Sequence, residues 1–62
     1  MQFHIETMTC GGCARGVTKA IHSVDPSADV KADPATHTVR VTSTAPREQL
    51  VAVLTDAGFA PA

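Results

Sequence analysis

The residues with the clearest chemistry stand in one short segment, Met8-Thr9-Cys10-Gly11-Gly12-Cys13. Two residues separate the cysteines, so both sulfur atoms can converge on one point, and the glycines leave the backbone free to bring them there. Cys13 stands where a helix is predicted to begin, and the dipole and unpaired amides of a helix start favour a thiolate there, with Cys10 close by. A pair of exposed low-pKa thiolates is a ligand set for a soft ion such as Cu(I).

The number of available ligands narrows the choice of ion. Structural zinc takes four protein ligands and catalytic zinc three plus a water, whereas this chain offers one CxxC pair and the separated histidines His4, His22 and His37. We expect all three histidines at the surface. Zinc would be under-coordinated, while Cu(I) accepts two or three soft ligands. A two-coordinate, exposed ion also leaves room for a partner's thiolate, so the pattern suits a site that hands its metal on.

Several neighbours of the cysteines have two interpretations. We expect Met8 to pack in the core rather than to bind the ion. Arg15 and Lys19, four residues apart on one predicted helix face, either solvate that face or form a docking patch for an acidic partner. Phe59 is interpreted as a core residue, as a lid over the metal loop, or as both.

Periodicity predicts the elements that position the pair. Residues 2–6 alternate between apolar and polar, which predicts a half-buried strand, and residues 7–12 form a loop. From Cys13 apolar residues recur at helical spacing, and Asp25-Pro26 ends this helix. The residues of its apolar stripe are Ala14, Val17, Ile21 and Val24.

The second half of the chain repeats this order. Alternation predicts strands over residues 28–33 and 38–42, joined by a turn at 33–37. A final short strand over 59–62 is restricted to an edge by its proline.

A second helix lies between the third and fourth strands. Pro46 suits its first turn, Thr44 or Ala45 its N-cap, and Gly58 its C-terminal cap. The predicted inward positions are Leu50, Leu54 and Ala57, while the pattern does not decide between Val51 and Val53.

The order strand, helix, strand, strand, helix, strand predicts an α+β, ferredoxin-like βαββαβ fold. Its four-stranded antiparallel sheet would carry both helices on one face. With 62 residues and 44% hydrophobic residues, the chain is expected to be one domain, 1–62, that leaves no deep cavity for a substrate. We therefore do not expect an enzyme.

Charge and composition exclude other classes of function. Five basic and six acidic residues give a formal net charge of −1, and Trp and Tyr are absent, which argues against binding to nucleic acid or an anionic membrane. The longest apolar run, residues 50–54, is far below the roughly 20 residues of a membrane span. Residues 1–6 do not resemble a secretory signal, so we expect a cytoplasmic protein whose cysteines stay reduced.

The sequence resembles the heavy-metal-associated domains, which occur as small copper chaperones and as N-terminal modules of metal-pumping P-type ATPases. The resemblance covers essentially the whole chain and rests on Met8, Cys10 and Cys13 as Met-x-Cys-x-x-Cys, on the element order, and on Ala57-Gly58-Phe59. It implies Cu(I) held by the two cysteines, with the methionine under the loop, and transfer of the ion to an ATPase domain of the same fold. It also implies copper shared between two copies of the chain.

Two positions depart from the pattern of the chaperones. At the position of Phe59, bacterial chaperones often have Tyr and eukaryotic chaperones Lys. Phe at this position is common in the ATPase modules. Gly12 stands where chaperones often have His between the cysteines, which argues against a third protein ligand.

Three alternatives stay open at this point. CxxC at a helix start also describes thiol oxidoreductases, although that fold needs about a hundred residues. The ion could instead be Hg(II), Zn(II) or Cd(II). Glutathione or His4 could supply a further ligand.

Overall fold

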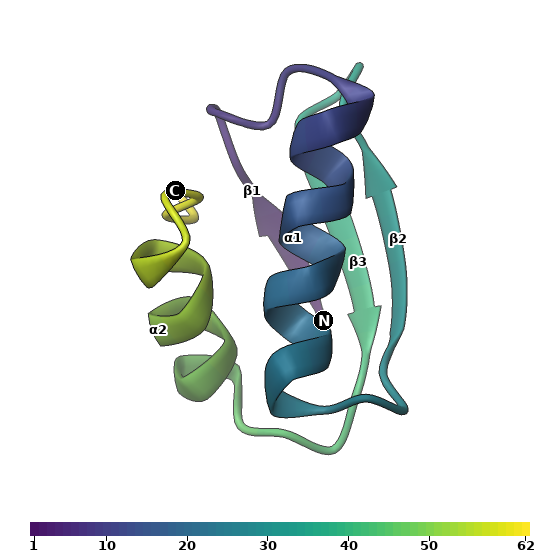
Figure 1. Cartoon of the computed structure of the whole chain (residues 1–62), viewed down its shortest axis with the longest axis vertical. Coiled ribbons are helices and arrows are strands. Elements are labelled where there is room, and N and C mark those ends of the chain that lie inside the picture. The colour runs from purple at the N-terminus through teal and green to yellow at the C-terminus, as the bar shows by residue number, and fades with distance from the viewer.

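A computed structural model describes all residues, 1–62. The elements are β1 (Gln2–His4), α1 (Gly11–Val24), β2 (Asp29–Asp33), β3 (Thr38–Thr42) and α2 (Arg47–Asp56). The strands form an antiparallel sheet in the order β1-β3-β2. Helix α1 crosses one face of this sheet and α2 stands beside α1 (Figure 1). This is the predicted α+β, ferredoxin-like arrangement with two helices. Neither helix has both the length and the apolar character needed to span a membrane.

The predicted fourth strand is not formed, so the sheet has three strands. Residues 59–62 have no strand structure, and a single backbone hydrogen bond of 2.7 Å joins the Ala62 N–H to the His4 carbonyl on β1. Pro61 has no N–H to donate, which removes one of the bonds that a ladder along β1 would need.

The first two elements have different boundaries from those predicted. β1 ends at His4 because the ladder with β3 loses its reciprocal bond at the next pair. The N–H of Ile5 still donates to the carbonyl of His37, at 2.8 Å, but the N–H of His37 donates to the carbonyl of Pro34 instead. α1 begins at Gly11 instead of Cys13, with Cys10 as its N-cap. Cys13 therefore lies inside the first helical turn, where its Cα position is fixed by helix geometry.

The second helix also differs at both ends. Pro46 is itself the N-cap, since its carbonyl accepts the bonds from the N–H groups of Gln49 and Leu50, so the choice of Thr44 or Ala45 was wrong. Ala57, predicted to face inward, is exposed at the C-terminal end.

The core lies between the sheet and the helices and fixes how α1 sits on the sheet. The predicted helix positions Val17, Ile21, Leu50 and Leu54 are fully buried, and Val51 rather than Val53 packs against them. The remaining core residues are Phe3, Ile5, Met8, Ala28, Val39 and Val41.

Candidate metal-binding site

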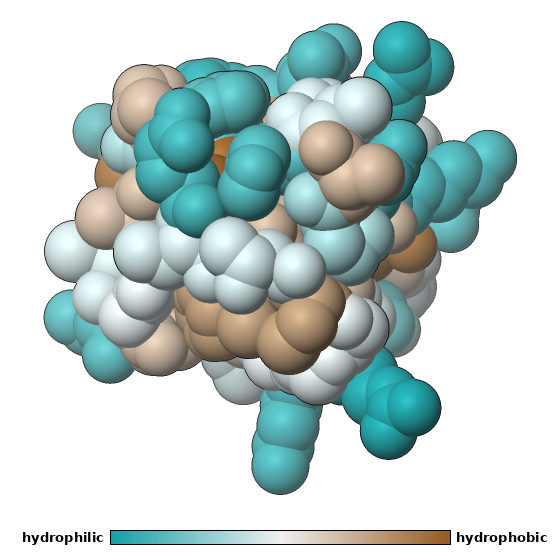
Figure 2. All heavy atoms as spheres, turned by 90° about the horizontal axis from the view of Figure 1, so that it is seen from above, coloured by the Kyte–Doolittle hydropathy of each residue, from teal (hydrophilic) through white to brown (hydrophobic).

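The two cysteines lie at one end of the molecule, where β1 leads into α1. We call residues 5–10 the cysteine loop. The turn between β2 and β3 lies at the same end (Figure 1). Seen from above, this end shows an apolar patch among pale and hydrophilic residues (Figure 2).

The structure brings the predicted ligands Cys10 and Cys13 together. Cys10 is exposed at the N-cap, Cys13 is half-buried, and the Cys10 thiol donates a hydrogen bond to Cys13 Sγ across 3.3 Å. Both cysteines are free, and the separation is well above the roughly 2.0 Å of a disulfide bond. The sulfur atoms are thus two adjacent thiol groups within reach of one ion.

Local hydrogen bonds stabilise the anion at Cys13. Its pKa lies below the ordinary value of a thiol, first because the backbone N–H of Thr9 donates to its sulfur and second because the Cys10 thiol does. Partial burial opposes this shift. The sequence predicted a stabilised thiolate here from the helix start, but the leading donor is an amide of the cysteine loop.

The two glycines between the cysteines are not needed for an unusual backbone. Neither has a positive φ, and both belong to the first turn of α1. A Cβ atom would meet nothing within 4 Å at Gly11 and only Cys10 Sγ, at 3.9 Å, at Gly12. Gly12 thus leaves the space beside Cys10 Sγ without a side chain, and Gly11 borders open space, so another molecule can approach this end of the helix.

The cysteine loop is held from below and from two sides. Met8 is fully buried, which confirms the prediction that it packs in the core. On one side the ring Nδ1 of His37 lies 3.0 Å from the Met8 carbonyl oxygen. On the other side the Thr7 hydroxyl donates to the carbonyl of Gly58 at 3.3 Å. The loop is therefore tied to two turns that are distant in sequence.

The structure does not bring histidines to the sulfur atoms. His4 lies exposed on β1, and its Nε2 is 2.6 Å from a carboxylate oxygen of Glu6, whose pKa it lowers. His22 and His37, expected at the surface, are half-buried and each bonds a backbone carbonyl. No group of three or more His, Cys, Asp or Glu side chains is placed to hold a metal ion.

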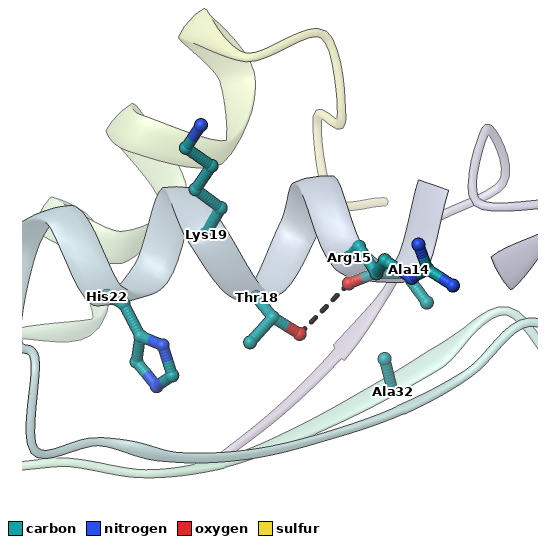
Figure 3. Close-up of a pocket in the computed structure, with 6 residues that line it drawn as sticks. All are labelled: Ala14, Arg15, Thr18, Lys19, His22 and Ala32. Atoms are coloured by element: carbon teal, nitrogen blue, oxygen red, sulfur yellow. Dashed lines mark hydrogen bonds between the residues drawn. The ribbon is translucent and has the colours of Figure 1, made fainter. Parts of the chain in front are cut away.

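Arg15 and Lys19 border a shallow hollow between α1 and β2, next to the cysteine-bearing end of the helix (Figure 3). The other lining residues are Ala14, Thr18, His22 and Ala32. Lys19 extends away from the strand, and Arg15 lies at the end of the hollow nearer the helix start. Neither side chain forms a salt bridge within the chain. Both cations are thus available to an acidic partner, as one of the two interpretations requires.

Phe59 reaches α1 through the end of α2. Gly58 has a φ of +89°, and its N–H donates to the carbonyl of Thr55. The N–H of Phe59 donates to the carbonyl of Leu54. These two bonds are the hydrogen-bond pattern of a Schellman cap. The ring then lies on Gly16 of α1, where a Cβ would be 3.1 Å from Phe59 Cε2. Phe59 is half-buried one helical turn from Cys13, consistent with its prediction as a core residue.

Sequence reasoning missed two residues that shape the site, His37 and Gly16. The only signal for His37 is its position in a turn rich in Pro and Asp, and nothing local links that turn to the cysteines. A glycine within a helical pattern does indicate a close approach, and Gly16 could have been found on that ground.

Chemically, the site offers two soft ligands, one of them a stabilised thiolate, on an exposed helix start. No further side chain occupies the remaining coordination positions of an ion bound there. Such a site can bind a thiophilic ion and accept an additional ligand from outside.

Known proteins are similar to this chain in sequence and fold. The family model of the heavy-metal-associated domain matches residues 2–60. Among solved structures, a gold-binding protein is 52% identical with a TM-score of 0.96, over 98% of this chain and 94% of that one. The copper chaperone Atx1 from Synechocystis PCC6803 is 34% identical with a TM-score of 0.96, over 100% and 98% of the two chains.

A third relative extends the comparison to another organism. Protein Atu1203 from Agrobacterium tumefaciens is 40% identical with a TM-score of 0.89, over 100% and 97% of the two chains. No curated protein sequence matches the chain with significance. The match over residues 2–60 and these relatives establish that the chain belongs to the heavy-metal-associated domain family.

Proposed function

We propose that the protein is a cytoplasmic copper chaperone that binds one Cu(I) through Cys10 and Cys13. The observation that carries the proposal is the pair of free thiols, 3.3 Å apart at the start of α1 and without a third protein ligand. Two soft sulfur ligands suit Cu(I) and leave zinc short of its usual coordination. The similarity to Atx1 from Synechocystis supports the same cargo.

Delivery would proceed by ligand exchange with the metal-binding domain of a copper-transporting P-type ATPase. A thiolate of the partner enters the open side of the coordination sphere, a three-coordinate intermediate forms, and one cysteine of this chain departs. The exposed Cys10 and the bare backbone at Gly11 and Gly12 favour such an approach. Arg15 and Lys19 would guide an acidic partner and raise the rate of encounter more than the affinity.

A competition titration with a Cu(I) chelator tests the proposal. We expect one tightly bound Cu(I) per reduced chain, and loss of tight binding in both Cys10→Ser and Cys13→Ser with the fold retained. His4→Ala is the matched control, because His4 pairs with Glu6 rather than with the cysteines, and it should bind copper like the wild type. Full copper occupancy in either serine variant would refute the assignment.

Au(I) is a second candidate cargo, favoured by the 52% identity to a gold-binding protein. Both ions are monovalent and soft, so the two sulfur atoms suit either. Loading the reduced protein with equal amounts of Cu(I) and Au(I), followed by native mass spectrometry, ranks the two. Predominant gold occupancy would replace copper as the cargo while leaving the ligands unchanged.

Two further features of the proposal have their own tests. Copper shared between two copies would increase the apparent size in size-exclusion chromatography on adding Cu(I), and unchanged mobility would rule this out. The rival function, thiol redox catalysis, predicts insulin reduction at a rate comparable to thioredoxin, which we do not expect.

A further inference from the structure

His37, in the turn between β2 and β3, contacts the cysteine loop from a distant part of the sequence. Its ring Nδ1 is 3.0 Å from the Met8 carbonyl oxygen, and its own carbonyl accepts a 2.8 Å hydrogen bond from the N–H of Ile5. His37 is the one non-glycine residue with a positive φ, 56°. Such a backbone is uncommon and persists where surrounding contacts fix it. The turn is therefore held against the cysteine loop at two points.

The contact with the Met8 carbonyl oxygen determines which ring nitrogen of His37 carries a proton. A carbonyl oxygen only accepts hydrogen bonds, so the His37 Nδ1 carries the proton. The Met8 carbonyl and the Thr9 N–H belong to one planar peptide group, which is trans because the chain has no cis peptide bond. They point in opposite directions, and turning one turns the other. The Thr9 backbone is also the leading cause of the lowered pKa of the Cys13 thiol.

We propose that His37 is a positioning residue for the cysteine pair: it holds the Met8–Thr9 peptide group so that the Thr9 N–H is aimed at Cys13 Sγ. Because a hydrogen bond to the carbonyl polarises the peptide group, the His37 bond would also strengthen the interaction of the Thr9 N–H with the sulfur. The geometry is that of the metal-free dithiol, while its consequence for metal affinity rests on the proposed function. Partners that orient ligands from outside the coordination sphere commonly tune that affinity.

Two substitutions separate the ring donor from the unusual backbone. His37→Asn tolerates the left-handed conformation and places an amide donor near the position of Nδ1, whereas His37→Gly tolerates the conformation and has no donor. The probe is the backbone amide proton of Thr9 in NMR spectra of the reduced, metal-free protein. Cys13→Ala gives its chemical shift without the sulfur acceptor. We expect the asparagine variant to match the wild type and the glycine variant to shift toward the Cys13→Ala value.

Copper binding provides the second measurement. In the chelator competition we expect His37→Gly to weaken Cu(I) binding about tenfold, and His37→Asn to restore it. His22→Ala is the matched control, since its ring also bonds a backbone carbonyl, that of Ala28 at 2.9 Å, near the opposite end of α1. It should lower the melting temperature and change neither the Thr9 signal nor the copper affinity.

The two measurements test the positioning role and the proposed function separately. Equal Thr9 shifts in the asparagine and glycine variants would overturn the positioning role whatever copper does. A wild-type protein that ignores Cu(I) would refute the proposed function, while the Thr9 shift would still decide the present inference. If His37→Gly does not fold, His37→Asp replaces it, because aspartate tolerates the same backbone and offers only acceptor oxygens to the Met8 carbonyl.

Discussion

At the scale of single residues, the two cysteines have unequal surroundings. Cys10 is exposed at the N-cap, while Cys13 lies half-buried in the first turn and receives hydrogen bonds from Thr9 and Cys10. A lowered pKa favours the thiolate, the form of cysteine that binds metals, at Cys13, while Cys10 is the more accessible sulfur. In the proposed copper site the pair would therefore combine a firmly held ligand with one that a partner can reach.

Asp25 illustrates a second single-residue effect, at the far end of α1. Its carboxylate accepts hydrogen bonds from the Ser43 hydroxyl at 2.6 Å and from the hydroxyl and N–H of Ser27 at 2.7 and 3.1 Å. These bonds lower its pKa, with Ser43 the largest cause. Because the folded-state pKa lies below the unfolded one, the stabilisation is complete above about pH 4 and is lost as the pH falls through the folded-state value.

We therefore predict that Asp25→Asn lowers the urea midpoint at pH 7, and that the difference from wild type narrows as the pH falls below about 4. Asp29→Asn is the control, since Asp29 lies exposed at the start of β2, and it should change the midpoint little. A difference between wild type and Asp25→Asn that is constant from pH 7 to pH 2 would contradict the assignment.

At the scale of elements, the contact between α1 and the end of α2 depends on a missing side chain. The Schellman cap at Gly58 directs Phe59 onto α1, and Gly16 leaves room for the ring. Replacing a helix-interior glycine by alanine normally gains about 1 kcal/mol. At Gly16 the new Cβ would lie 3.1 and 3.2 Å from two ring atoms, so the ring must shift.

A double-mutant cycle measures this contact. We predict that Gly16→Ala gains little or loses stability in the wild-type background, and gains about 1 kcal/mol when Phe59 is already alanine, as urea unfolding of the four proteins would show. Gly11→Ala is the matched control, because a Cβ there meets nothing within 4 Å, and its effect should not depend on Phe59. Additive effects at Gly16 would contradict the proposed packing.

Elements whose signal is local could be predicted from the sequence. The stripe of α1, the alternation of β2 and β3 and the cap at Gly58 each depend on neighbours within a few positions. The start of α1 was predicted two residues late, because two consecutive glycines suggest a loop. In the structure both glycines belong to the first helical turn. The prediction of a fourth strand was wrong, because pairing along β1 depends on long-range contacts that a pattern of four residues does not specify.

At the scale of the whole molecule, stability comes from a small core. Ten of the 62 residues are buried, and Leu54 is among those with no exposed surface. A domain of this size has only about 3–5 kcal/mol available from its core. Any large cavity in the core therefore removes much of the total.

We predict that Leu54→Ala costs about 2–5 kcal/mol and lowers the melting temperature by on the order of 10 °C or more, measured by circular dichroism. Val53→Ala is the neighbouring control, because Val53 is half-buried and lies outside the core cluster. Equal losses for the two variants would mean that the core has been placed incorrectly.

The candidate site could be predicted only in part, for reasons that belong to the whole molecule. Cys10 and Cys13 are adjacent because of their spacing, which the sequence states directly. His37 and Gly16 act through packing between elements that are far apart in the chain, and no local pattern reports such contacts. The half-burial of His22 has a more local origin, since its carbonyl partner, Ala28, follows shortly after the end of α1.

The only two residues with left-handed backbones, His37 and Gly58, stand on opposite sides of the cysteine loop and each holds it through a hydrogen bond. Most amino acids are strained in that backbone, although neither position belongs to the buried core. A saturation-mutagenesis survey of the chain should consequently find two isolated positions outside the core, one half-buried and one exposed, with the narrow substitution tolerance otherwise confined to its interior.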